Sequence, residues 1–71
     1  MTDEKRQQYR TYIGKRIAEE RAKLGLSQRD LAGLSGYDPA TIAKIELGRW
    51  SAGIDVIGRI ADAMGLRVDL I

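Results

Sequence analysis

Glycines divide this chain into short segments of helical periodicity, and that pattern restricts the fold more than any other feature. Apolar residues recur at three- and four-residue steps in four segments, and each segment is followed by a glycine, the residue that most readily takes the left-handed conformation after a helix. The apolar positions are Ile13, Ile17 and Leu24; Leu31, Ala32 and Leu34; Ile42 and Ile45; and Ile54, Ile57, Ile60, Ala61 and Met64, with Gly25, Gly36, Gly48 and Gly65 after them. The pattern predicts an all-α fold of four helices.

Two of the predicted helices also carry clear start signals. Ser27 is followed three residues later by Asp30, which is a variant of the capping box. Asp38 suits the N-cap of the third helix, and Pro39 suits its first turn, where a missing N–H costs nothing. Gly58 lies inside the fourth helix, where close packing against a neighbour would account for it.

The length and composition exclude several classes of protein. A chain of 71 residues without Cys or His predicts a single domain over residues 1–71, with no disulfide, no thiol nucleophile and no metal site. Residues 1–8 are polar, and we expect them to be frayed helix or coil. No apolar run approaches the ~20 residues of a membrane span, so we expect a cytoplasmic protein with no membrane partner.

The residues also argue against an enzyme. No serine has a histidine or cysteine companion, and no glycine-rich phosphate loop follows a strand. We therefore expect no catalytic residues and no cofactor.

The segment 66–71 changes period. Apolar Leu66, Val68 and Leu70 alternate with charged Arg67 and Asp69. This alternation is typical of a strand, yet the chain offers no second strand to pair with it. Pairing with the same segment of a second copy about a two-fold axis would resolve this, because Arg67 would then face Asp69 of the other copy. The alternatives are a frayed tail or one more helical turn.

Residues 27–47 predict a helix-turn-helix, in which a short helix and a glycine-containing turn hold a second capped helix outward. Capped helix pairs also occur in other all-α domains, so periodicity alone leaves both interpretations open. A family resemblance favours the first. The chain resembles the lambda-repressor-like, Cro-type (XRE) helix-turn-helix family from about Tyr12 to Met64, in the residues Arg21, Gly25-Leu26-Ser27-Gln28, Leu31-Ala32, Gly36, Thr41-Ile42 and Ile45-Glu46-x-Gly48.

The resemblance implies roles for individual residues. Ala32 would let the two helices approach, and an ion pair between Arg21 and Glu46 would tie the first helix to the end of the third. The implied DNA-binding residues are Gln28, Arg29, Asp38, Pro39, Ala40, Thr41, Lys44 and Arg49. Lys44 would donate to a guanine edge, and Gln28 would contact a phosphate. The alternative for each is an ordinary solvated side chain, and for Trp50 we expect partial burial.

The resulting functional hypothesis is a transcriptional regulator that binds double-stranded DNA. It would be a homodimeric repressor that recognises an inverted-repeat operator through the helix starting at Asp38. The compact size also resembles antitoxin-like autoregulators, which would imply a toxin partner. The alternative is a helix-turn-helix module used mainly for protein–protein contact. The balanced charge between Ser27 and Ala52 motivates this alternative, since three basic and three acidic side chains in that range cancel.

Overall fold

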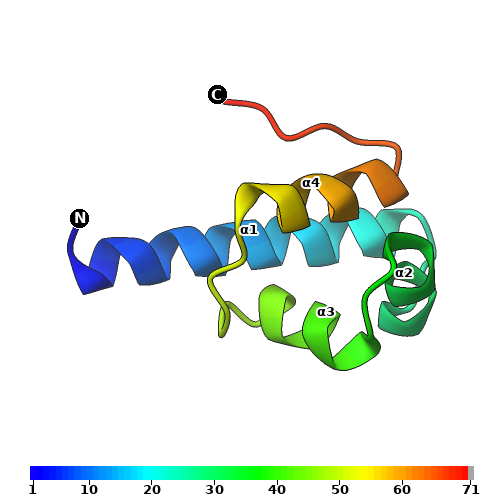
Figure 1. The fold of residues 1–71 in the computed structure, drawn as a ribbon, viewed down its shortest axis with the longest axis horizontal. Helices are drawn as coiled ribbons and strands as arrows, with labels where there is room; N and C mark the ends of the chain where they lie inside the picture. The colour runs from blue at the N-terminus through cyan, green and yellow to red at the C-terminus, as the bar shows by residue number, and fades with distance from the viewer. Residues whose placement is uncertain (71) are drawn as a thin grey trace.

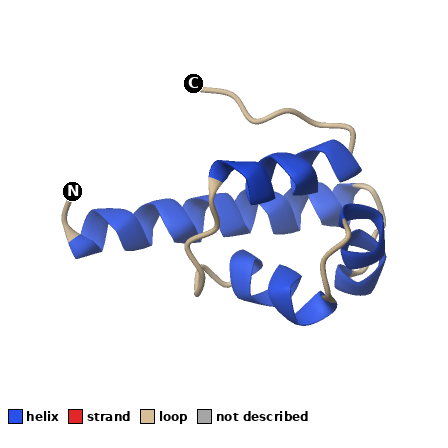
Figure 2. Cartoon of the chain, in the orientation of Figure 1, coloured by secondary structure: helices blue, strands red, loops and turns tan. Residues whose placement is uncertain are grey.

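The computed structural model describes residues 1–70, which form four helices and no strand (Figures 1 and 2). The helices are α1 (Asp3–Lys23), α2 (Gln28–Ser35), α3 (Pro39–Glu46) and α4 (Ile54–Ala63). In Figure 1, α1 runs the length of the molecule with α3 below it and α4 above it, and α2 lies at the end where α1 stops. The predicted all-α fold is confirmed. Within the described residues, no helix has the length and apolar character that a membrane crossing requires.

The predicted start signals of α2 and α3 are confirmed. The Ser27 hydroxyl accepts from the backbone N–H of Asp30, and the Asp30 carboxylate accepts from the backbone N–H of Ser27, both at 2.9 Å. The Asp38 carboxylate accepts from the backbone N–H of Thr41 at 2.7 Å, and Pro39 is the first residue of α3. Each cap thus satisfies an N–H group that has no partner inside its helix.

The expectation that residues 1–8 are frayed is wrong, because α1 begins at Asp3. The Thr2 hydroxyl caps the helix by accepting from the backbone N–H of Lys5 at 3.1 Å. Acidic side chains in the first turn suit the positive end of the helix dipole. The Gln7 side-chain amide donates to the backbone carbonyl of Gly48 at 3.0 Å, which ties this end of α1 to the rest of the domain.

The core is a single apolar cluster between the four helices. Its buried members are Ile17, Leu31, Ala32, Ile42, Ile45, Ile60 and Met64. Leu31, Ile42 and Ile45, which the helical spacing marked as apolar positions, are therefore core residues. Leu24, Leu34 and Ile54 were expected on buried faces but are more than half exposed.

Gly14 permits a close contact between α1 and α3 that the sequence did not predict. A Cβ atom at this position would overlap the backbone carbonyl oxygen of Ile45 and lie 2.7 Å from that of Glu46. Only a residue without a side chain lets α1 lie this close to the end of α3. Gly58 is the opposite case, since nothing lies within 4 Å of an added Cβ. Close packing therefore does not explain Gly58.

The segment after α4 contains no strand within the described residues, and Ile71 lies outside them. The backbone N–H of Leu66 donates to the carbonyl of Ala61 at 2.9 Å, which closes the end of α4. Beyond it, residues 67–70 make no backbone hydrogen bond to another described segment. Apart from the Leu70 N–H, which donates to the Asp69 carboxylate at 2.8 Å, their backbone groups have no hydrogen-bond partner among the described residues. Pairing with a second copy stays a prediction.

Gly14 and Gly58 offer a matched pair of alanine substitutions. Gly14→Ala should destabilise the fold by about 1–3 kcal/mol, because backbone atoms of α3 must move to admit the methyl group. Gly58→Ala should stabilise it by up to about 1 kcal/mol, since it removes the entropic cost of glycine in a helix and meets open space. Urea unfolding followed by circular dichroism measures both. A Gly14→Ala variant that is as stable as the wild type, or more stable, would contradict the close approach of α1 and α3.

Candidate nucleic-acid interface

The turn between α2 and α3 holds α3 outward. Gly36 takes φ = +83°, and the backbone N–H groups of Gly36 and Tyr37 both donate to the carbonyl of Ala32, at 2.9 and 3.0 Å. This left-handed turn ends α2 and redirects the chain into the Asp38 cap. The fully buried Leu31 and Ile42 join the inner faces of the two helices. The opposite edge of α3 therefore faces away from the core.

That outer edge is open. Pro39, Ala40 and Lys44 are exposed, and Thr41 is half-buried. Thr41, Lys44, Arg49 and Trp50 line one shallow hollow beside α3. The structure thus brings together three of the residues that the sequence nominated for DNA contact. Trp50, for which partial burial was expected, is 42% exposed and forms one wall of this hollow.

The acidic side chains near this edge are occupied by hydrogen bonds to the protein. Backbone and side-chain contacts with Ser27 lower the pKa of Asp30, and those with Thr41 lower the pKa of Asp38. Lys44 and Arg49, in contrast, form no ion pair within residues 1–70. Cations without fixed partners therefore line the hollow, although the charges in this part of the chain cancel by count.

Glu46 joins three helices through its carboxylate. Arg21 donates to it from Nε at 2.6 Å and from Nη2 at 3.0 Å, and Gln28 Nε2 donates at 3.0 Å. Arg21 Nη1 also donates to the backbone carbonyl of Leu26 at 2.8 Å. The Glu46 side chain is only 5% exposed, and its hydrogen bond raises the pKa of Arg21. The bidentate geometry is the strong form of a carboxylate–guanidinium pair.

Two nominated residues lie apart from the hollow. The side chain of Gln28 is half-buried and engaged by Glu46, so one of its two amide hydrogens remains for another acceptor. Arg29 is exposed on α2 and lies beside Leu26 and Gly33 instead. Gln28 and Arg29 both stand in the first turn of α2, where free backbone N–H groups favour an anion.

The geometry agrees with known proteins. The sequence profile described as helix-turn-helix matches residues 17–71 of the chain. The chain belongs to the XRE-type helix-turn-helix family. It is 43% identical over 49 residues to an uncharacterised HTH-type transcriptional regulator of Methanothermobacter thermautotrophicus, covering 69% of this chain and 71% of that protein. It is 39% identical over 56 residues to the human endothelial differentiation-related factor 1, covering 79% of this chain but 38% of the human protein.

Two solved structures are similar in fold. The clp gene regulator ClgR from C. glutamicum superposes with a TM-score of 0.81 at 27% identity, over 83% of this chain and 76% of that one. The restriction-modification controller protein C.AhdI from Aeromonas hydrophila gives 0.82 at 31% identity, over 86% and 88%. The family is one of DNA-binding helix-turn-helix domains, and the two similar structures are named as a gene regulator and a controller protein.

The Glu46 network makes Arg21 important for stability. Arg21→Met should cost about 3 kcal/mol, because it leaves the buried Glu46 carboxylate without its cation. Arg16→Met on the same helix is the matched control, since Arg16 is 47% exposed and its pair with Glu20 is long, at 3.4 Å. An exposed pair of this kind contributes at most about 1 kcal/mol. Chemical denaturation of both variants compares them, and equal losses would show that the Glu46 network is not special.

Proposed function

We propose that this protein is a dimeric, sequence-specific repressor that inserts the outer edge of α3 into the major groove of an inverted-repeat operator. The observation that carries the proposal is the open hollow beside α3, where Thr41, Lys44 and Arg49 meet and the two basic side chains form no ion pair within residues 1–70. Occupying a promoter-proximal site would block polymerase. The regulatory names of ClgR and C.AhdI support the same role.

Each residue at this edge makes a different contact with the duplex. Lys44 donates to guanine O6 or N7, while the exposed methyl of Ala40 contacts a thymine methyl. Thr41 bonds a base edge or a phosphate. Asp38 and Pro39 act at the start of α3, where the Asp38 carboxylate is held by the N–H of Thr41 and fixes the orientation of the edge.

Phosphate contacts flank the reading edge. Arg49 lies next to Lys44 in the hollow and neutralises a phosphate on one side. On the other side, Gln28 and Arg29 contact the backbone from the first turn of α2, where free N–H groups also point outward. Glu46 holds the Gln28 side chain in place for this contact.

A two-fold dimer would place two α3 edges in successive major grooves, roughly 34 Å apart. The exposed backbone of residues 67–70 supplies the pairing surface, through an antiparallel contact centred on Val68. The interface residues are then Leu66, Arg67, Val68, Asp69 and Leu70.

Selection of duplexes from a random pool by the purified protein tests the whole proposal. We expect an enriched inverted repeat whose binding weakens steeply as salt rises, because phosphate contacts release counterions. A pool without enrichment, together with salt-independent capture of a protein partner, would favour a protein–protein module instead.

Lys44→Ala should weaken binding to the selected operator by about 1–3 kcal/mol and relax the preference at one base position, with unchanged folding. Lys15→Ala is the matched control, because Lys15 is an exposed lysine on α1 away from the hollow. Fluorescence anisotropy with labelled duplex measures both. If the two substitutions weaken binding equally, Lys44 does not contact a base and contributes only through its positive charge.

A charge exchange tests the proposed dimer. Arg67→Asp should weaken self-association, since it places two carboxylates opposite each other, and the double variant R67D/D69R should restore it. Sedimentation equilibrium measures the dimer constant of each variant. A wild-type monomer, or an R67D variant that associates as strongly as wild type, would reject the antiparallel pair.

A further inference from the structure

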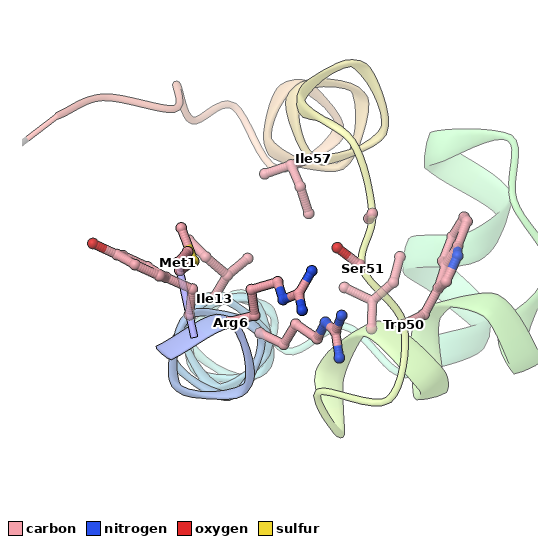
Figure 3. A pocket seen from close by; sticks show the side chains of 10 residues that line it. Met1, Arg6, Ile13, Trp50, Ser51 and Ile57 are labelled. Carbon is pink, nitrogen blue, oxygen red and sulfur yellow. The ribbon is translucent and has the colours of Figure 1, made fainter. Parts of the chain in front are cut away.

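We propose that this protein binds a small amphipathic organic anion, a carboxylate or phosphate monoester with an apolar body, in a pocket between the first half of α1, the loop 47–53 and α4. The pocket has a volume of about 250 Å³ and shares only Trp50 with the hollow beside α3. Figure 3 shows it from close by, with Arg6 and Ile13 on α1, Ile57 on α4, and Trp50 and Ser51 on the loop.

Arg10 supplies the strongest reason to expect an anion here. Its side chain lines the pocket, and its Nε is buried without a hydrogen-bond partner within residues 1–70. The guanidinium makes one long hydrogen bond, from Nη1 to Gln7 Oε1 at 3.4 Å, and no ion pair among the described residues. The guanidinium thus lacks a strong acceptor among the described residues, and an anion in the pocket would supply one.

Arg6 adds a second guanidinium to the same pocket. It pairs with Asp3, whose side chain is 93% exposed, so that carboxylate competes weakly from the solvent side. Among the described residues, no acidic side chain lines the pocket. Two planar guanidinium groups facing one space match the geometry of a carboxylate or phosphate group.

The rest of the pocket is suited to an apolar body. Apart from Ser51, the other lining residues are apolar or aromatic, among them Tyr9, Ile13, Trp50 and Ile57. Pockets for drug-sized ligands measure about 300–1,000 Å³, so this smaller volume fits a molecule of the size of a single ring or a short chain. The occupant is therefore a small organic anion rather than a nucleotide or a peptide.

The experiment uses Trp50, which is the only tryptophan of the chain and lines the pocket. Its fluorescence is followed while benzoate or phenyl phosphate is added to the full-length protein without DNA. We expect a saturable change for at least one of the anions and binding at least about tenfold weaker for the neutral benzyl alcohol, since one charge-assisted hydrogen bond corresponds to about that factor. Because no duplex is present, the result is independent of the proposed operator binding.

Substitutions on α1 decide whether Arg10 carries the binding. Arg10→Met should weaken anion binding by about tenfold or more, and Arg10→Lys should weaken it less, since a charge remains but the fork geometry is lost. Arg16→Met removes the same side chain from the same helix outside the pocket and should leave binding unchanged. Circular dichroism checks the fold of each variant.

Three results would overturn the proposal. They are the absence of a saturable signal with either anion, equal binding of benzyl alcohol, and anion binding that Arg10→Met and Arg10→Lys both leave intact. If Arg10→Met fails to fold, Arg10→Lys alone decides the last point.

Discussion

The buried carboxylate of Glu46 is the interaction on which the arrangement of the first three helices depends. Glu46 is the last residue of α3. Its carboxylate accepts two hydrogen bonds from Arg21 on α1 and a third from Gln28 on α2. Burying a carboxylate is costly unless its charge is paired and its oxygens are bonded, and here all three donors converge on it. A change in the angle of α3 would break at least one of these bonds. The network therefore fixes the orientation of α3, and with it the direction in which its outer edge faces.

The same network changes the electrostatic interpretation of the surface. Counted along the chain, Arg29, Lys44 and Arg49 balance Asp30, Asp38 and Glu46, and that balance motivated the protein–protein alternative. In the structure, Glu46 faces inward against Arg21, and the two aspartates bond to backbone N–H groups at helix starts. An anion approaching α3 thus meets basic side chains that form no ion pair among the described residues, while the nearby carboxylates are already engaged. Charge position, rather than net charge, makes this edge suitable for phosphates.

Local signals in the sequence were enough to predict much of this fold. The caps at Ser27 and Asp38 and the turn at Gly36 depend on a few neighbouring residues, so they can be inferred from the chain alone. The role of Gly14 could not, because it depends on a carbonyl of α3 that is more than thirty residues away. The start of α1 was missed for a similar reason, since Gln7 is anchored by Gly48. The Thr2 cap followed by Asp3 and Glu4 was a local signal that could have been used. The pocket around Arg10 has no sequence signature, because its walls come from three separate segments.

The length of α3 limits what one copy of this domain can read. Eight helical residues span about 12 Å, so few side chains reach base edges at once, and only Thr41 and Lys44 are polar residues on the open side. The binding free energy available from one copy is therefore small, and a second copy on the same duplex would roughly double the phosphate and base contacts. Residues 67–70 follow α4 without a backbone–backbone hydrogen bond to another described segment, on the opposite side of the molecule from α3 in Figure 1. A contact made there would join two copies without covering either reading edge, which is the condition that a two-site regulator of this size must meet.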